Sequence, residues 1–341
     1  MQDERPVMVT VYAVAYNHAK YIRQALDGMV MQKTDFRFEI LVHDDASTDE
    51  TADIIREYEA KYPELIRPIY QKENLHSRQI PRNKNYLLPM TRGKYIAWCE
   101  CDDFWTDPLK LQKQFDALEA HPDCCLCVGR VKVIMTDEGS SKCWQLPDFE
   151  LATGIKKQDE FLRLMKTYSF QTSTYFIVTD IFRELYTHKP EFANYTTVDV
   201  AILLFSATKG SVYYIDDQLS CYRWSSDGSF TSNFWSKPLE KSRNHYLKNI
   251  EARKLFDEFT GGRFHDVLES HIDVLNKLIV KLEFKFAEKN KDYKTMIQKK
   301  YAEFHPYWKK RDYCFVWLMA YCPWLMNTLR SVKNLLKGKI A

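Results

Sequence analysis

The sequence predicts an α/β fold in which a mostly parallel sheet is flanked by helices and followed by a C-terminal helical extension. In the first hundred residues, short apolar runs alternate with stretches of helical periodicity, as they do in βαβ units. Beyond Trp235 the pattern changes to long, charged, helical segments. The chain has 341 residues, of which 45% are hydrophobic, and this composition supports a large core and excludes a disordered protein.

The predicted strands are short runs of β-branched and other apolar residues. The first run, residues 7–15, is almost entirely apolar, which is typical of a strand that is buried on both faces. We expect further strands at residues 38–42, 65–70, 95–99, 125–135, 175–178 and 212–215.

Helices are expected between these strands, and three of them carry a starting signal. Asn17 can cap the first helix with its side chain. Ser47 and Glu50 match the capping box of the second, which ends near residue 62. Asp107 and Pro108 fit the cap and the first turn of a third. Further helices are expected at residues 200–208 and 267–286.

The last apolar stretch, residues 313–329, contains no charged residue and lies between groups of basic residues. As a helix it would reach about 26 Å, which is short of a hydrocarbon core of roughly 30 Å, and Pro323 interrupts it. We therefore expect this segment to lie in a membrane interface, with its basic residues on anionic lipid. The alternative is a terminal helix that docks on the body of the protein or on a dimer partner.

The charges and cysteines limit the class of protein further. The formal net charge of +3 is too small to indicate nucleic-acid binding. From Lys237 onward there are 22 Lys and Arg against 12 Asp and Glu, so the preceding body is acidic. Nine cysteines and an N-terminus without an apolar signal-peptide core favour reduced thiols in the cytosol. Cys124 and Cys127 form one CxxC pair without a second, so buried thiols are favoured over a zinc site.

Two acidic clusters follow predicted strands. Asp44 and Asp45 come after the strand at 38–42, and Glu100, Asp102 and Asp103 come after the strand at 95–99. Carboxylates can be simple turn and cap residues. Two clusters at corresponding strand ends of one sheet instead favour a divalent cation with oxygen ligands and a phosphate bound to it.

Four segments resemble one enzyme family. The segments are AYNHAKYIRQAL, VHDDASTDET, GKYIAWCECDDFWTDPLKLQKQ, and YTTVDVAILLFSATKGSVYYID followed by LSCYR. Over about residues 5–225 they are similar, in the same order, to the inverting family 2 glycosyltransferases with the GT-A (Rossmann-like) fold. The expected organisation is a GT-A domain at 1–235, a helical extension at 236–312 and a membrane-associating tail at 313–341.

The resemblance implies roles for five acidic residues. Asp45 would accept a hydrogen bond from the base of the donor nucleotide, and Asp44 is the weaker candidate for that role. Asp102 would lie near the donor ribose and the metal, and Asp103 would bind Mg²⁺ or Mn²⁺ directly. Asp199 falls on the catalytic base, although the residues before it would also suit a helix cap.

Three further assignments concern the donor and the acceptor. Arg78 and Arg223 are candidate contacts of the donor, and Arg82 and Lys84 lie in the same loop as Arg78, where a diphosphate or base contact is equally plausible. Trp105 is a candidate for stacking on the acceptor sugar. The sequence departs from the family pattern in two places: no glycine follows Asn74, and no histidine follows Arg223 closely. His18 and His43 lack partners at metal-ligand spacing, so we interpret them as structural.

The expected function is transfer of a sugar from a nucleotide-diphosphate sugar, with UDP-sugars favoured, to a hydroxyl of a glycan or lipid-linked acceptor. The cation would stabilise the leaving diphosphate, and one carboxylate would take the acceptor proton. The expected location is the inner face of the cell membrane, on the cytoplasmic side. A sugar-phosphate nucleotidyltransferase should have a glycine-rich loop where AVAYNHAKY stands. A catalytically inactive, membrane-bound partner protein should lack the set of Asp45, Asp103 and Asp199.

Overall fold

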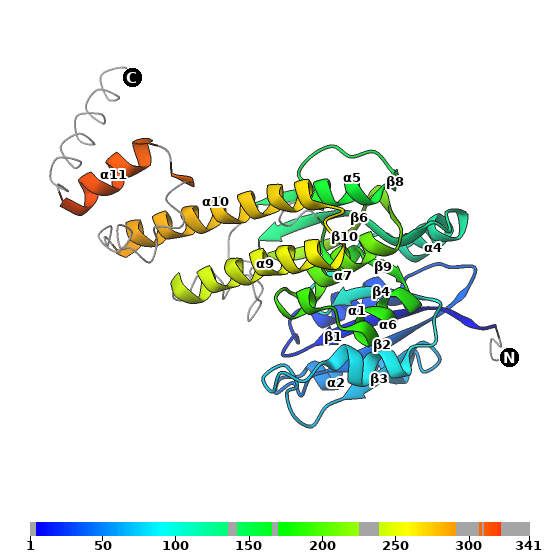
Figure 1. Cartoon of the computed structure of the whole chain (residues 1–341). Coiled ribbons are helices and arrows are strands. Elements are labelled where there is room, and N and C mark those ends of the chain that lie inside the picture. Colours follow the sequence, from blue (N-terminus) through cyan, green and yellow to red (C-terminus); the bar gives the residue numbers. More distant parts are fainter. Residues whose placement is uncertain are drawn as a thin grey trace, which may run out of the picture.

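The computed structural model describes residues 5–135, 142–165, 170–224, 239–290, 307–308 and 310–321. The expected boundary at 235–236 and the tail from residue 322 onward lie outside these residues, so the domain limits stay predictions. Figure 1 shows a body with a central sheet between helices, from which two long helices project.

Ten strands form one sheet in the order β3-β2-β1-β4-β9-β6-β10-β5, with β7 beside β6 and β8 beside β10. The strands are β1 (Val7–Ala15), β2 (Arg37–Asp44), β3 (Ile66–Tyr70), β4 (Tyr95–Glu100), β5 (Phe104–Trp105), β6 (Cys124–Met135), β7 (Cys143–Leu146), β8 (Gly154–Lys156), β9 (Phe176–Val178) and β10 (Ser211–Trp224). Strand β1 pairs in parallel with β2 and with β4, and β2 pairs in parallel with β3. Strands β6 and β10 also pair in parallel. The short strands β5, β7, β8 and β9 pair antiparallel.

The α/β class is therefore confirmed, and the sheet is mixed. The N-terminal strands β1 to β4 pair in parallel where continuous apolar runs predicted buried strands, and β6 and β10 form a second parallel pair. The antiparallel strands β5 and β9 have two and three residues, which is too short for a periodic signal in the sequence. Strand β10 extends well beyond the predicted residues 212–215, because register shifts after Ile215 interrupt its apolar pattern.

The helices are α1 (Ile22–Val30), α2 (Thr51–Lys61), α3 (Leu88–Met90), α4 (Lys110–Ala120), α5 (Gln158–Met165), α6 (Thr179–His188), α7 (Val198–Lys209), α9 (Leu239–Phe259), α10 (His265–Asn290) and α11 (Lys310–Tyr321). Short turns of other helix types are η1 (Asn83–Leu87), η2 (Thr172–Thr174) and η3 (Glu191–Asn194). Helices α1, α2 and α4 cover one face of the sheet and bury one large apolar cluster. Helices α5, α6 and α7 cover the other face.

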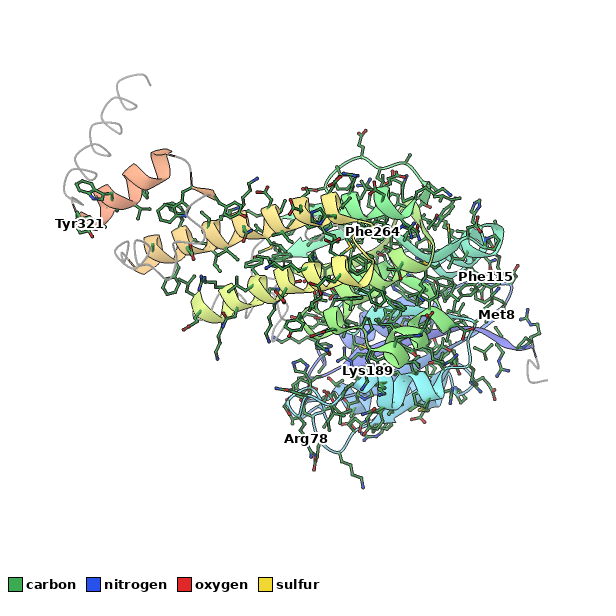
Figure 2. All side chains as sticks on the ribbon, in the orientation of Figure 1. Met8, Arg78, Phe115, Lys189, Phe264 and Tyr321 are labelled. Atoms are coloured by element: carbon green, nitrogen blue, oxygen red, sulfur yellow. The ribbon has the colours of Figure 1, made fainter. Side chains whose placement is uncertain are left out.

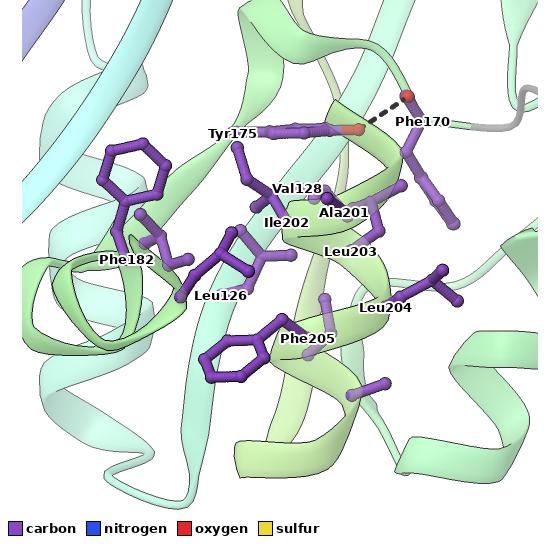
Figure 3. Close-up of a cluster of buried hydrophobic side chains, with 14 of the residues drawn as sticks. Leu126, Val128, Phe170, Tyr175, Phe182, Ala201, Ile202, Leu203, Leu204 and Phe205 are labelled. Atoms are coloured by element: carbon purple, nitrogen blue, oxygen red, sulfur yellow. Dashed lines mark hydrogen bonds between the residues drawn. The ribbon is translucent and has the colours of Figure 1, made fainter. Parts of the chain in front are cut away.

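Helix α7 is apolar around most of its circumference because it lies between the sheet and the helical extension. Its residues Ile202, Leu203 and Phe205 are buried in the same cluster as Phe182 of α6 (Figure 3). The extension adds Phe256 to that cluster. A helix with no polar face is stable only when other elements pack against several of its sides, so α7 and the extension stabilise each other by burying a shared apolar cluster.

The extension is thus part of the main core at one end, and it has a core of its own at the other. Helices α9 and α10 lie side by side and turn at Gly261 and Gly262, both with positive φ. Helix α11 lies near the far end of α10 (Figure 1). Ile250 and Ile279 form a cluster with Trp308 and with Val316 of α11. The described part of the tail is therefore docked on the helical extension, which was the alternative for this segment.

The predicted helix caps are wrong in detail. Asn17 does not cap α1, which begins at Ile22; its backbone has φ of 55°, and its side-chain oxygen accepts a hydrogen bond from Thr48 N at 2.7 Å. Ser47 Oγ in turn accepts from Asn17 N at 2.9 Å instead of capping α2. Both polar side chains join the β1–α1 and β2–α2 loops to each other. Local spacing cannot reveal such long-range partners.

Candidate active site

The strands bring the two acidic clusters to one edge of the sheet. In the parallel register Ala15 lies opposite Asp44, and Val14 lies opposite Glu100, so β2 and β4 end at nearly the same level on either side of β1. The amides of Asp45 and Cys101 donate to the carbonyls of Ala15 and Val14, both at 2.9 Å. These bonds carry the pairing one residue past the strands and fix where each acidic loop begins.

Glu100, Asp102 and Asp103 form one carboxylate cluster. One oxygen from each of them can be chosen so that all lie within 4.8 Å of one another. Burial and the charge of Asp102 raise the pKa of Glu100 to about 7, and the same two causes raise the pKa of Asp103. Three crowded carboxylates with oxygen ligands suit a hard divalent cation, so the donor set fits Mg²⁺ or Mn²⁺.

Arg223 holds this cluster in place. Its backbone N–H donates to Asp103 Oδ1 at 2.9 Å, its Nη1 donates to the Asp102 carbonyl at 2.5 Å, and its Nη2 donates to Gln24 of α1. The guanidinium lies over the rings of Tyr21 and Phe104, at 5.0 and 4.5 Å. Arg223 therefore links β10, the acidic loop and α1, and its contact with a diphosphate stays a prediction.

Gln171 is a contact of the cluster that the sequence did not indicate. It is buried, and its Nε2 donates to Asp103 Oδ2 at 3.5 Å. Residue 171 follows no acidic motif, so nothing in the local sequence could have placed it here.

Asp45 organises the loop that follows β3. Its two carboxylate oxygens accept from the backbone N–H groups of Leu75 and His76, at 2.7 and 3.1 Å, and its carbonyl accepts from Asn74. Asp44 is also buried; it accepts from Ser47 N at 3.3 Å, and burial raises its pKa. Both residues lie at the end of β2, and their contacts with a donor nucleotide stay predictions.

Of the two arginines in the 74–85 loop, Arg82 faces the acidic cluster and Arg78 does not. Arg78 lies at the outer surface of the body, is 59% exposed and pairs with Glu73 (Figure 2). Arg82 Nη2 lies 4.0 Å from Glu100 Oε1. The two residues are equivalent on sequence grounds, and the predicted contact of Arg78 with the donor stays a prediction.

The two histidines near the strand ends differ. His43 is fully buried, its Nε2 lies 3.2 Å from Gln71 Nε2, and burial lowers its pKa to about 4, which suits a structural residue. His18 lies close enough to Asp102 for that charge to affect its pKa, although burial lowers the pKa overall. His18 therefore belongs to the surroundings of the acidic cluster.

Asp199 is the second residue of α7 and is partly exposed. The N-cap position belongs to Thr197, so the alternative of Asp199 as the helix cap is wrong. The negative charge of Asp199 contributes to the raised pKa of Glu100, which places the two carboxylates in one electrostatic environment. Its role as the base stays a prediction.

Trp105 is placed differently from the prediction. The side chain is 1% exposed, its indole N–H donates to the Ser173 carbonyl at 2.9 Å, and Lys110 Nζ lies 4.1 Å from the ring centre. A ring enclosed in this way has no free face for a sugar, so Trp105 supports the site from within the core. The sequence could show that Trp105 is near the carboxylates but not which way it points.

The cysteines are placed as expected. Cys99, Cys101, Cys124, Cys125 and Cys127 are buried free thiols. Within the described ranges, the group of Glu100, Asp102 and Asp103 is the one set of side chains with metal-ligand geometry.

The fold agrees with comparisons to known proteins. Residues 10–183, about half of the chain, match glycosyl transferase family 2, and the chain belongs to that family. An uncharacterized protein of Mycobacterium tuberculosis, Rv1520, is 46% identical over 129 residues, which are 38% of this chain and 36% of the relative. Chondroitin synthase of Escherichia coli is 35% identical over 101 residues, 30% of this chain and 14% of the relative.

Among solved structures, S. aureus TarS 1-349 in complex with UDP-GlcNAc superimposes with a TM-score of 0.52. The match covers 81% of each chain at 15% identity, so the similarity concerns the fold. The segments shared with the curated relatives span little more than a third of those proteins at most.

Proposed function

We propose that the protein is a metal-dependent, inverting glycosyltransferase that transfers a sugar from a nucleotide-diphosphate sugar to a hydroxyl of a glycan or lipid-linked oligosaccharide. The observation that carries this proposal is the meeting of two acidic loops at one sheet edge, with Asp199 in the same electrostatic environment. Family membership supports the transfer reaction. UDP-GlcNAc bound to TarS supports UDP-sugars as the donor class.

Glu100, Asp102 and Asp103 would hold Mg²⁺ or Mn²⁺. When bound, the cation supplies positive charge against the negative charge that develops on the leaving diphosphate. The chain itself fixes the ligands before any donor arrives, because Arg223 and Gln171 hold the Asp103 carboxylate.

The nucleotide would bind beside Asp45. Both oxygens of that carboxylate already hold the 75–76 backbone, and each still has a lone pair for a hydrogen bond from the base. Arg82 comes later in the 74–85 loop, and its Nη2 lies 4.0 Å from Glu100 Oε1. A guanidinium beside the proposed metal site can reach an oxygen of the donor diphosphate. We therefore add Arg82 to Arg223 as a proposed diphosphate contact; Arg78, which pairs with Glu73 at the surface, would have to change partner to take part.

Asp199 would take the proton from the acceptor hydroxyl as that oxygen attacks the anomeric carbon. A hydroxyl is a weak nucleophile, and removal of its proton in the transition state is worth roughly 10²–10⁴ in rate. Attack from the face opposite the leaving diphosphate inverts the anomeric configuration. A single base is sufficient, because no glycosyl-enzyme intermediate needs a carboxylate nucleophile.

The experiment that tests this function is a calorimetric titration of the full chain with UDP-N-acetylglucosamine, UDP-glucose, GDP-mannose and a dTDP-sugar. Each titration is run with Mn²⁺ and again with EDTA. We expect one donor class to bind with Mn²⁺ and to lose most of its affinity in EDTA. Equal affinity in both buffers would contradict the metal assignment, and binding of no donor would contradict the function.

We also propose that the C-terminal region binds peripherally to the inner, cytoplasmic face of the cell membrane. None of the helices in the described residues is long and apolar enough to cross a bilayer. In α11, Val316 and Ala320 are buried against the extension, while Trp317 and Tyr321 are each 55% exposed, with their ring centres 5.6 Å apart. Exposed aromatic rings next to basic residues suit the headgroup region of an anionic membrane.

A further inference from the structure

Helix α9 of the extension contacts the segment that leads into α7. Phe192 of η3 packs edge-on against Phe256 and Phe259, with ring centres 5.1 and 5.5 Å apart. Thr196 Oγ1 donates to Asn249 Oδ1 at 2.8 Å. Residues 192–196 are therefore attached to α9 immediately before α7 begins with Val198 and Asp199.

Asn249 connects this segment to a buried arginine. Its Oδ1 accepts from Arg253 Nη1 at 2.8 Å as well as from Thr196, and its carbonyl accepts from the same Nη1 at 3.2 Å. Asn249 itself is fixed, because its Nδ2 donates to the His245 carbonyl at 2.9 Å. One face of α9 thus carries a hydrogen-bond chain from Arg253 through Asn249 to Thr196.

The burial of Arg253 lowers the stability of the folded protein. It is 2% exposed, its Nε has no hydrogen-bond partner among the described residues, and its Nη1 donates to the uncharged side chain and carbonyl of Asn249. A buried charge without an ion pair costs several kcal/mol, and an apolar side chain of similar volume would pack here at lower cost. Packing alone therefore does not account for an arginine.

The one carboxylate whose charge acts on Arg253 is Asp199. Burial lowers the pKa of Arg253 to about 10, and the negative charge of Asp199 opposes that change. Arg253 on α9 and Asp199 at the start of α7 are therefore close enough in the folded chain for their opposite charges to interact.

We propose that Arg253 and Asn249 are positioning residues for Asp199: Asn249, which Arg253 holds by hydrogen bonds, fixes the segment before α7, and the positive charge of Arg253 attracts the Asp199 carboxylate into place. This inference rests on the proposed role of Asp199 as the base. It gives the helical extension a part in catalysis, whereas the sequence indicated only a separate helical segment. Neither side chain needs to touch the donor or the acceptor.

The test is a double-mutant cycle on turnover in the full chain. The reaction is release of UDP from UDP-N-acetylglucosamine or UDP-glucose with Mn²⁺, and the variants are Arg253→Met, Asp199→Asn and the double variant. We expect Arg253→Met to lower kcat by roughly 10- to 100-fold, the range for a misplaced catalytic group, with little change in the donor KM. In the Asp199→Asn background the same change should have almost no further effect.

Two variants separate positioning from stability. Arg253→Lys keeps the charge and one donor, so it should recover most of the turnover. Ile279→Ala loosens the extension in its separate cluster without changing any charge, so it should lower the melting temperature and leave kcat nearly unchanged. If Arg253→Met does not fold, Asn249→Ala takes its place in the cycle, with the same expected loss and the same absence of an effect on Asp199→Asn.

The outcomes decide between the proposals. Equal losses of kcat in both backgrounds, or no loss at all, would overturn the positioning role of Arg253 and leave the base assignment intact. Full turnover of Asp199→Asn alone would instead overturn the base assignment. The two failures can therefore be distinguished within one set of proteins.

Discussion

Replacing Asp103 by asparagine should stabilise the metal-free protein and remove its response to Mn²⁺. The ligand atoms of the three carboxylates lie within 4.8 Å, and at that distance two unit charges repel by about 3 kcal/mol at an effective dielectric constant of roughly 20. In bulk water the repulsion is about 1 kcal/mol. Glu100 is 41% exposed and Asp102 is also partly exposed, so the lower value applies to the pair that each forms with Asp103.

Asp103→Asn removes two of the three repulsions and keeps an oxygen that can accept from Arg223 N. We expect a gain of about 2 kcal/mol in the free energy of unfolding in EDTA, which is a rise of about 2–4 °C or more in the melting temperature. Wild-type protein should gain about 2.7 kcal/mol when Mn²⁺ is at 100 times its dissociation constant, and the variant should gain almost nothing.

Differential scanning fluorimetry in EDTA and in Mn²⁺ measures both effects. Asp148→Asn is the matched control, because it removes the same charge from an exposed residue away from the cluster. A variant that is no more stable than wild type in EDTA would refute the repulsion argument. A variant that still gains stability from Mn²⁺ would refute Asp103 as a ligand.

Three further predictions concern the rest of the molecule. Glu39 is buried, and its carboxylate accepts a hydrogen bond from Arg67 at 2.6 Å. Burial alone would raise the pKa of Glu39, but the hydrogen bonds from Arg92 and Arg67 lower it by more. Glu39→Ala should therefore cost about 3–5 kcal/mol in urea unfolding at pH 7, with a smaller loss once the pH falls below the lowered pKa; an equal loss at both pH values would contradict this. Ala46 has φ of 61°, so Ala46→Gly should raise the unfolding free energy by about 0.5–1 kcal/mol, and a decrease would show that the strain is absent. Replacing both exposed rings of α11, Trp317 and Tyr321, by serine should reduce co-sedimentation with phosphatidylserine vesicles at low and high salt without lowering the melting temperature; unchanged sedimentation would contradict the membrane proposal.

Truncation of the tail has a different expected effect from the one that the sequence alone indicates. From sequence, residues 313–341 are a separable segment whose removal leaves the body intact. Val316 and Ala320 are buried against Ile279 and its neighbours, so the truncation would expose that cluster. The double serine variant leaves this packing in place and is the better test of membrane binding.

The fold could be predicted where buried strands leave a continuous signal. The apolar runs that become β1, β2 and β4, and the carboxylates that follow β2 and β4, identified the sheet edge and its chemistry. The carboxyl ends of neighbouring parallel strands lie at the same edge of a sheet, so the sequence alone predicted that Asp45 and Asp103 lie at one edge. The strand order and the antiparallel additions depend on pairs distant in sequence, which local periodicity does not record.

The details of the site depend on directions of side chains and on distant partners. Trp105 has the right position in sequence and the wrong orientation for an acceptor contact. Arg78 and Arg82 differ only in which side of a loop they occupy. Arg253 reaches the neighbourhood of Asp199 from more than fifty residues further along the chain. None of these orientations and contacts produces a local pattern in the sequence, so only the structure reveals them.

The most direct test of the proposed reaction is the effect of Asp199→Asn on two quantities measured with the same donor. Donor affinity is measured by calorimetry with Mn²⁺, and turnover is measured as release of the nucleoside diphosphate. Because Asp199 would face the acceptor and not the diphosphate, we predict donor affinity within about twofold of wild type and turnover lower by roughly 10²–10⁴. Turnover equal to that of wild type, or a loss of donor affinity as large as the loss of turnover, would contradict Asp199 as the base of a glycosyl transfer.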